Sequence, residues 1–388
     1  MASSIADRAI SDARRFGNAL LKFISPNNVG QTGSHECGYY LPKSAWELYT
    51  QHPPDKDVNY EDAIEITWQD GRITDSRIKW YGVGTRSEYR LTRFGKDFPY
   101  LTSGNIGDLL VLVRTGTPSF SAYVLDLEED IADVQAELGV EITGSWGIYQ
   151  AGAEVAEDID DCLDRHFRAF TLSLDTFPGT AEFSTKALEA VRNCIHEFAS
   201  ETADERLMRL MTAEYRLFRM AERHLCQNDI QRLFKSIDDF LVTAATIMNR
   251  RKARAGRSLE NHFEHILNDA HIPFEVRPLV DGRPDIIIPG KKEYYDLHYP
   301  TEKLIMVGVK TTCKDRWRQV LNEARRVPKK HLLTIQPGIS GAQLNEMHEA
   351  GVSLIVPRVL QKEYPSDSRM TLLTVDDFVT AIRHTLEG

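Results

Sequence analysis

The sequence predicts a two-domain protein of mixed structure, α+β or α/β, with a β-rich N-terminal domain and a C-terminal α/β domain. Three observations support this prediction. Short runs of β-branched and aromatic residues, separated by turn-forming residues, fill positions 1 to about 145. A largely helical stretch follows at 186–250, and helix-like and strand-like segments alternate after it. We therefore expect the C-terminal domain to be a mixed sheet flanked by helices.

The N-terminal domain is expected to be a barrel or a sandwich of short strands. Strands are predicted at 63–68, 77–83, 109–114 and 121–127, and a helix at 128–138. Clusters of Gly, Asn, Asp and Pro between the runs mark turns. Closely spaced short strands of this kind are typical of barrels and sandwiches.

Changes in composition place the domain boundaries. We expect an N-terminal domain at 1–150, a linker at 151–185 and a C-terminal domain at 186–388. The linker mixes Gly, Pro and acidic residues, and its apolar residues follow only a weak period.

The C-terminal domain is expected to alternate helices and strands. A helix is predicted to begin at Ser258, whose hydroxyl can cap it, with Leu259, Phe263 and Ile266 on one face. The remaining predicted elements are strands at 284–290, 303–312, 331–336 and 352–357, and helices at 315–326 and 342–351.

The net charge of −10 is unfavourable for binding nucleic acid, but its distribution is uneven. Acidic residues concentrate at 154–164, and basic residues concentrate at 250–257 and 310–330. Segregation of this kind can present a basic cleft on an acidic body. Each run can equally be an ordinary solvated face.

Cysteine use and hydropathy bear on the compartment. Five cysteines, an odd number without a CxxC pair, argue against a disulfide framework and against a zinc knuckle. The N-terminus carries charges where a signal peptide needs an apolar core, and no apolar run approaches the ~20 residues of a membrane span. We expect a cytoplasmic protein without membrane contact.

A phosphate loop and a dinucleotide fingerprint are both absent from the sequence, so we expect no nucleotide cofactor.

One constellation is suited to metal-dependent hydrolysis of a phosphodiester. Asp285 follows Pro284, and Lys310 ends a predicted strand whose side chains alternate between two faces. Nucleases of the PD…(D/E)xK kind need two carboxylates for Mg²⁺, which prefers oxygen ligands, and a lysine near the attacking water. The usual second acid would stand at Gly308, so it must come from elsewhere. A lysine at a strand end is also often a solvated edge residue.

Glu323 is the best candidate for the displaced acid. The predicted helix at 315–326 places Glu323 on the same face as Arg316. That face can point toward the end of the strand that carries Lys310. Glu260, from the preceding helix, is a possible outer-sphere helper.

The segment VKTTCKDRWRQVLNEA at 309–324 closely resembles the catalytic core of EcoRII-type restriction endonucleases. Similar stretches occur in the same order, and they are NRRKARAGRSLENHFEHIL, RPDIIIPG, KKHLLTIQPGIS and EAGVSLIVP, within a core of 245–388. NNVGQTGSHECGYYLP and TRSEYRLTRFGK resemble the N-terminal effector domain of the same family. That resemblance implies a DNA-binding pseudobarrel related to plant B3 domains.

The resemblance assigns roles to individual residues. It implies that Asp285 and Glu323 bind Mg²⁺ and that Lys310 is the catalytic lysine. Tyr294 matches a tyrosine near the active site of the family, although a simply packed tyrosine is also a reasonable interpretation. For contact with DNA, the resemblance implies that CC/GG pairs are read by Lys314, Asp315 and Arg316. It implies a structural or phosphate-binding role for Arg318. In the effector domain it implies that one arm carries Arg86, Glu88, Arg90 and Arg93, and that Lys22, Thr32 and His35 lie near the other arm.

The resemblance also implies an activity and partners. The expected reaction is hydrolysis of double-stranded DNA at CCWGG or a related site, leaving 5′-phosphates. A nearly palindromic site calls for a homodimer. A second copy of the site, bound by the effector domain, would relieve autoinhibition. Two alternatives stay open, namely a DNA-binding regulator that does not cleave, and an endonuclease of different CC/GG-type specificity.

Overall fold

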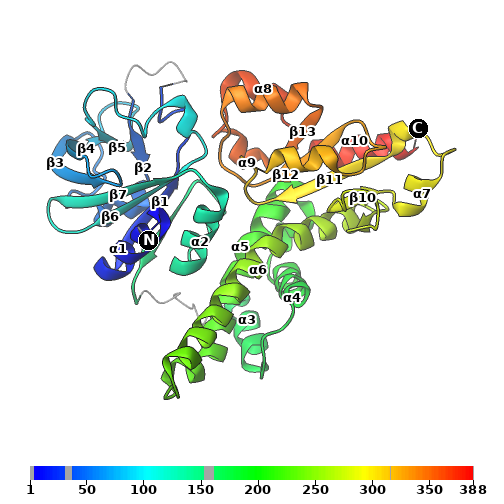
Figure 1. Ribbon diagram of the computed structural model, residues 1–388, viewed down its shortest axis with the longest axis horizontal. Coiled ribbons are helices and arrows are strands. Elements are labelled where there is room, and N and C mark those ends of the chain that lie inside the picture. The colour runs from blue at the N-terminus through cyan, green and yellow to red at the C-terminus, as the bar shows by residue number, and fades with distance from the viewer. Residues whose placement is uncertain (1–3, 31–36, 153–160, 315, 388) are drawn as a thin grey trace. The chain divides into compact units, whose positions relative to one another are not determined.

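The computed structural model describes residues 4–30, 37–152, 161–314 and 316–387 (Figure 1). Contacts divide the chain into two compact units. The first comprises Met1–Ala153 with the short segments Gln336–Asn345 and Leu360–Met370. The second comprises Glu154–Ile335, Glu346–Val359 and Thr371–Gly388. Each unit is described separately.

One eight-stranded sheet forms the centre of the first unit. Its strands are β1 (Asn18–Phe23), β2 (Tyr39–Leu41), β3 (Asn59–Trp68), β4 (Ile73–Tyr81), β5 (Glu88–Thr92), β6 (Leu109–Arg114), β7 (Ser119–Leu125) and β8 (Trp146–Gln150). The order across the sheet is β2-β5-β4-β3-β7-β6-β1-β8, with β3 and β7 parallel and the other neighbours antiparallel. The four predicted strands are confirmed, with ends that differ by a few residues.

Side chains alternate along each strand. Strands β1, β6 and β7 are buried on both faces, whereas β3 and β4 are buried on one face and largely exposed on the other. On one face, Leu20, Trp68, Trp80 and Tyr89 belong to a core that strands from across the whole sheet share, so the sheet curls around it. On the other face, Leu21 and its neighbours pack against α1 (Ile5–Phe16) and α2 (Glu128–Leu138). Helix α2 lies where the sequence predicted it. The expected barrel or sandwich is a single curled sheet whose edge strands are β2 and β8. Short 3-10 helices lie at Lys43–Leu48 and Ser103–Asn105.

The second unit begins with a group of packed helices (Figure 1). They are α3 (Cys162–Leu172), α4 (Thr180–Cys194), α5 (Ala203–Gln231) and α6 (Ile237–Asp269), with a 3-10 helix at His196–Ser200. Helix α3 lies in the segment expected to be a linker, and that expectation is wrong for these residues, because Phe167 is buried in the core with Phe183 and Leu217. The predicted helix start at Ser258 is also wrong. Helix α6 begins after Ser236, and the buried Ser258 hydroxyl contacts the sulfur of Met211.

A five-stranded mixed sheet completes the second unit, as predicted. Its order is β13 (Val352–Ile355), β12 (Lys330–Thr334), β11 (Ile305–Lys310), β10 (Ile286–Ile288) and β9 (Glu275–Val276). Strands β9, β10 and β11 are antiparallel, and β11, β12 and β13 are parallel. The remaining helices are α7 (Lys291–Tyr295), α8 (Gly341–Glu349), α9 (Arg358–Gln361) and α10 (Val375–Glu387), with 3-10 helices at Thr301–Lys303, Trp317–Asn322 and Ser366–Thr371.

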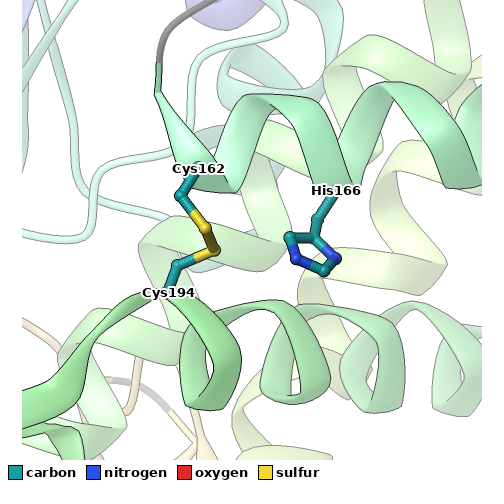
Figure 2. A group of neighbouring side chains, drawn as sticks. All are labelled: Cys162, His166 and Cys194. Atoms are coloured by element: carbon teal, nitrogen blue, oxygen red, sulfur yellow. A yellow bond between two sulfur atoms is a disulfide. The ribbon is translucent and has the colours of Figure 1, made fainter.

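Two expectations about covalent structure and membranes can be compared with the structure. Cys162 and Cys194 form a disulfide, so the expectation of no disulfide is wrong for this pair (Figure 2). The packing of α3 against α4 brings together two cysteines that are 32 positions apart in the sequence. In the described ranges, every helix is too short or too polar to cross a membrane.

Asp204 ties the start of α5 to the C-terminal region of the second unit. Asp204 is 3% exposed, and its carboxylate accepts hydrogen bonds from the backbone N–H groups of Arg358 (2.9 Å), Val375 (3.0 Å) and Asp376 (3.1 Å).

We expect Asp204→Ala to lower the free energy of unfolding by about 3 kcal/mol, because it leaves buried donors unpaired. Thermal unfolding followed by circular dichroism tests this. The exposed Asp238→Ala should change stability by less than about 0.5 kcal/mol, and equal melting temperatures for the two variants would contradict the role of Asp204.

Candidate active site

The site is built around Asp285, at the point where β10 and β11 pair. Ile286 of β10 lies opposite Val307 of β11, so Asp285 lies beside the C-terminal end of β11. One carboxylate oxygen of Asp285 accepts hydrogen bonds from the backbone N–H of Val309 (2.7 Å) and from Nζ of Lys310 (2.8 Å). The two side chains are partly buried, with 15% of Asp285 and 26% of Lys310 exposed. The structure thus brings together the acid and the lysine that the sequence singled out.

Gly308 shows why the second acid is displaced. A Cβ atom added at Gly308 would lie 2.8 Å from Cγ1 of Val320 and 3.2 Å from Cδ1 of Leu332. The first distance is shorter than carbon atoms tolerate, so an acidic side chain at this position would force the neighbouring segments apart. Close packing at Gly308 therefore requires the second carboxylate to come from another segment.

Glu323 lies near Asp285 and Lys310, but it does not lie on a helix. The predicted helix at 315–326 is wrong, because only a 3-10 turn at Trp317–Asn322 forms and Glu323 is extended, with φ −94° and ψ 146°. Burial and the carboxylate of Asp285 raise the pKa of Glu323 to about 7, and Lys310 opposes this shift. Glu323 thus reaches the expected site from a loop.

Tertiary hydrogen bonds replace those that a helix would make here. Asp281 accepts the N–H groups of Ala324 (2.8 Å) and Arg325 (2.7 Å), through its carbonyl and its carboxylate respectively. The buried Nζ of Lys330 donates to the carbonyl oxygens of Glu323 (2.6 Å) and Ala324 (2.7 Å). These bonds hold the backbone of Glu323 in its extended conformation.

Gly282 and Tyr294 complete the support for Glu323. Gly282 has φ +73°, and a Cβ there would lie 2.5 Å from Cα of Glu323, so only glycine allows this approach. The hydroxyl of Tyr294, a residue only 4% exposed, donates to Asp281 and accepts the N–H of Arg326 at 3.2 Å. Tyr294 is therefore packed behind the segment that carries Glu323. No sequence motif singles out Asp281, Gly282 or Lys330 for this role, although the Asp-Gly pair just before Pro284 is a turn signal.

Glu260 adds a third carboxylate to the site. It lies on α6, is 7% exposed, and accepts hydrogen bonds from Arg277 and from Arg257 (3.2 Å). Burial and the charge of Asp285 raise the pKa of Glu260 to about 7, partly offset by Arg257 and Lys310. Asp285 thus acts electrostatically on both glutamates.

The donor set fits a divalent metal ion. Oε2 of Glu323 is buried and has no hydrogen-bond partner among the described residues. A buried acceptor of this kind is costly unless something binds to it. Carboxylate oxygens are the ligands that hard cations such as Mg²⁺ take up. Asp285 and Glu323 are the residues that could hold such an ion, with Glu260 close enough to influence it.

The candidate DNA-reading residues follow β11. Arg316 is exposed and Lys314 is half-buried, while Asp315 lies outside the described residues. The exposed Arg318 pairs with Glu346 at 2.6 Å and lies over the ring of Trp317, which is 3% exposed. Arg316 is therefore an exposed residue in the segment that directly follows β11.

The candidates in the first unit divide into exposed and buried residues. Arg86 and Arg93 are exposed. Arg90 is 6% exposed, because its guanidinium pairs with Glu88 (3.0 Å) and lies over the ring of Tyr40. Lys22 is 6% exposed, and burial lowers its pKa. We expected Arg90 and Lys22 to contact DNA, and their burial here does not match that expectation. Thr32 and His35 lie outside the described residues.

Comparisons with known proteins agree with a site of this kind. The sequence model of the family described as restriction endonuclease EcoRII, N-terminal, matches residues 16–152, and the one described as EcoRII C terminal matches 218–379. The chain is a site-specific deoxyribonuclease of the type II restriction class. Enzymes of this class generally use a divalent metal ion.

The particular family follows from the alignment of whole chains. The chain is 31% identical over 398 residues to the type II restriction enzyme EcoRII of Escherichia coli, and the alignment covers 93% of each protein. The chain therefore belongs to the EcoRII family. It is also 25% identical over 142 residues to the type II restriction enzyme SsoII of Shigella sonnei, over 33% of this chain and 45% of that enzyme.

Two solved structures are also similar to this chain. One is metal-depleted Ecl18kI in complex with uncleaved, modified DNA (TM-score 0.45, 18% identity, 56% of this chain and 83% of that chain). The other is the complex of restriction endonuclease PspGI with substrate DNA (TM-score 0.46, 16% identity, 54% of this chain and 94% of that chain).

The raised pKa of Glu323 predicts a pH dependence of stability in the absence of metal. A carboxyl group with a folded pKa of about 7 and an ordinary value of 4.5 stabilises the fold below about pH 4.5, and this stability is lost as the pH rises through 7. We expect Glu323→Gln to remove part of this loss, on the order of 1 kcal/mol. Melting temperatures from pH 5 to 8 in EDTA test this. The exposed Glu349→Gln is the control, and an unchanged pH slope in Glu323→Gln would refute the assignment.

The hydroxyl of Tyr294 should act on cleavage only through the position of Glu323. We expect Tyr294→Phe to reduce cleavage by about 10-fold and to raise the metal concentration needed for half-maximal rate, as is typical for outer-shell residues. Rates measured across a metal titration test this. Tyr295→Phe, at a neighbouring residue that is 58% exposed, should leave both values unchanged. A far larger loss of rate at an unchanged metal requirement would instead indicate that Tyr294 takes part in the chemistry.

Proposed function

We propose that this chain hydrolyses double-stranded DNA at CCWGG or a related site, uses Mg²⁺, and leaves 5′-phosphates. The observation that carries the proposal is the contact of 2.8 Å between Asp285 and Lys310, together with a carboxylate oxygen of Glu323 that has no hydrogen-bond partner among the described residues. Membership of the EcoRII family supplies the expected target. The cytoplasm, where unmodified foreign DNA would be met, is the proposed location.

In the proposed mechanism Asp285 and Glu323 would hold Mg²⁺, and Glu260 would act on the site without binding the ion directly. When bound, Mg²⁺ neutralises charge that develops on the scissile phosphate. Lys310 orients the attacking water and adds positive charge where the transition state becomes more negative. Its contact with Asp285 limits the motion of its ammonium group, so Lys310 is positioned before DNA arrives.

Base recognition is proposed for the segment after β11. Lys314 and Arg316 can donate to O6 and N7 of guanine, and Asp315 can accept from N4 of cytosine. The exposure of Arg316 supports this assignment. A nearly symmetric site is read most simply by two copies of the chain related by a two-fold axis, so we propose a homodimer.

The N-terminal domain at 1–150 is proposed to bind a second copy of the site and to activate cleavage allosterically. Its curled sheet is consistent with a B3-like pseudobarrel, and Arg86 and Arg93 are exposed cations that can contact phosphate. Such activation requires that the second copy change the affinity or rate at the first. The segment at 186–388 would carry catalysis.

Plasmid digestion tests the proposal. A plasmid with several CCWGG sites is incubated with the full chain in Mg²⁺ or in EDTA, beside Lys310→Ala and the control Lys292→Ala at an exposed lysine. We expect discrete fragments only in Mg²⁺, with 5′-phosphate ends at CCWGG, and a loss of at least about 100-fold in Lys310→Ala alone.

Other outcomes would overturn parts of the proposal. An intact plasmid whose mobility nevertheless shifts on a gel would favour a DNA-binding regulator that does not cleave. Discrete fragments with ends at other sequences would show an endonuclease of different CC/GG-type specificity. Equal rates of cleavage for a plasmid with many sites and for a short duplex with one site would overturn the second-site requirement.

A further inference from the structure

Three potential soft-metal ligands meet where α3 approaches the end of α4. Cys162 and His166 lie four positions apart on α3, and so share one face of the helix. Cys194 is the last residue of α4. The two sulfur atoms and a ring nitrogen of His166 all lie within 4.8 Å of one another (Figure 2). These residues are separate from the carboxylate site and have no part in the proposed cleavage of DNA.

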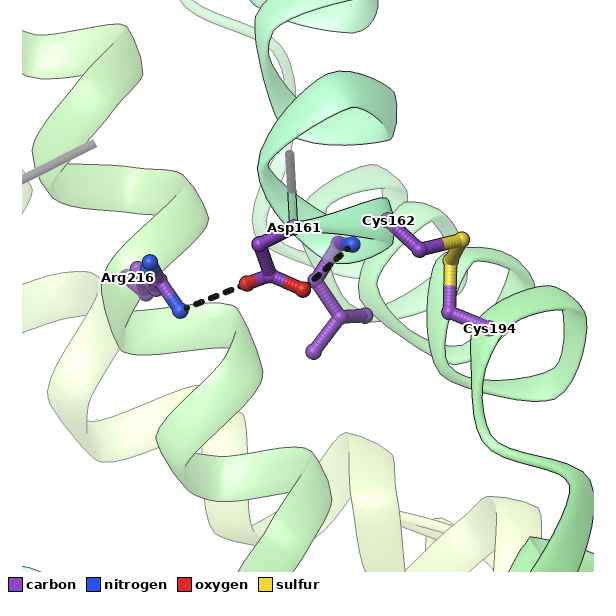
Figure 3. Close-up of a disulfide and its surroundings, with 5 residues drawn as sticks. Asp161, Cys162, Cys194 and Arg216 are labelled. Atoms are coloured by element: carbon purple, nitrogen blue, oxygen red, sulfur yellow. Dashed lines mark hydrogen bonds and ion pairs between the residues drawn. A yellow bond between two sulfur atoms is a disulfide. The ribbon is translucent and has the colours of Figure 1, made fainter. Parts of the chain in front are cut away.

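The position of α3 does not depend on the disulfide alone. Asp161 caps α3 by accepting the N–H of Leu163 at 3.2 Å, and its other oxygen pairs with Arg216 of α5 at 3.2 Å (Figure 3). Arg216 also pairs with the buried Asp164. The buried ring of Phe167 fixes the inner face of α3 in the same core as α4 and α5. Reduction of the disulfide would therefore leave the cysteines close together.

The chemistry of the three ligands selects a particular class of metal. Thiolate sulfur and imidazole nitrogen bind Zn²⁺ at about 2.3 Å and about 2.0–2.1 Å, usually in tetrahedral geometry. Mg²⁺ prefers oxygen ligands and is a poor match. The Cα atoms of the two cysteines are 5.6 Å apart, which lets both sulfur atoms reach one ion after small side-chain rotations. His166 is exposed, so the fourth position can be filled by water.

We propose that, once the disulfide is reduced, Cys162, Cys194 and His166 bind one zinc ion. A dithiol reductant supplies two electrons and two protons to the S–S bond and itself becomes a disulfide, which leaves two thiols on the protein. Each thiol then releases its proton to solvent as its sulfur binds Zn²⁺. The pair thus has two linked states, the disulfide and the zinc-bound form, and both hold α3 to the end of α4.

Cobalt titration of the full chain tests this proposal. The protein is reduced with a dithiol without oxygen, freed of reductant, and titrated with Co²⁺ as a spectroscopic substitute for Zn²⁺. We expect a sulfur-to-cobalt charge-transfer band and the visible bands of tetrahedral Co²⁺, which saturate at one ion per chain and disappear when Zn²⁺ is added. Oxidised protein should give neither band. Co²⁺ bound at the carboxylate site would have oxygen ligands and no sulfur band.

Variants locate the ligands. Cys162→Ser and Cys194→Ser should lose the charge-transfer band, and His166→Ala should lose the tetrahedral bands. His166 is exposed, so its replacement should not disturb the fold and keeps the test valid if a cysteine variant unfolds. The controls Cys37→Ser and His196→Ala remove an exposed cysteine and an exposed histidine elsewhere and should bind Co²⁺ normally. Absence of the band in the reduced wild-type protein, or its persistence in Cys162→Ser, would overturn the proposal.

Discussion

The proposed catalytic site depends on the hydrogen bonds that Asp285 accepts at the junction of β10 and β11. One oxygen takes both the backbone N–H of Val309 and the ammonium of Lys310, so the same contact closes the strand pair and places acid and lysine together. Charged hydrogen bonds of this kind are roughly twice as strong as neutral ones. The side chains around Asp285 therefore have a fixed reference point before metal or DNA binds.

Unfavourable electrostatic interactions between carboxylates are concentrated around Asp285. Glu260 is buried and Glu323 is half-buried, and this burial together with the charge of Asp285 raises the pKa of each to about 7. The guanidinium groups of Arg257 and Arg277 and the ammonium groups of Lys310 and Lys330 partly offset this negative charge. A cluster of this kind lowers the stability of the metal-free protein at neutral pH and makes a bound cation favourable. Affinity for a cation and loss of stability here have the same physical origin.

The sequence predicts the chemistry of this site better than its local structure. Asp285, Lys310 and the absence of an acid at Gly308 are visible in the sequence, and together they lead to Glu323. The helix expected around Glu323 does not form because Asp281 and Lys330 bond to the backbone of this segment. The sequence does not indicate that Asp281, 44 positions before Arg325, lies beside it. The same limit applies to Arg90, whose burial depends on Tyr40, 50 positions away. The pairing of Cys162 with Cys194 depends likewise on how α3 packs.

Donor chemistry separates the two metal sites that we propose for this chain. The carboxylate site offers only oxygen atoms, and it is positioned by the backbone of β11 and by the loop that carries Glu323. The site at Cys162, His166 and Cys194 offers sulfur and nitrogen, and it is positioned by helix packing. Affinity for zinc at the second site requires that both thiols lose their protons, whereas the first site requires that Glu323, whose pKa is about 7, lose its proton. Loss of the disulfide would therefore create a site for soft metals without altering the ligands proposed for Mg²⁺.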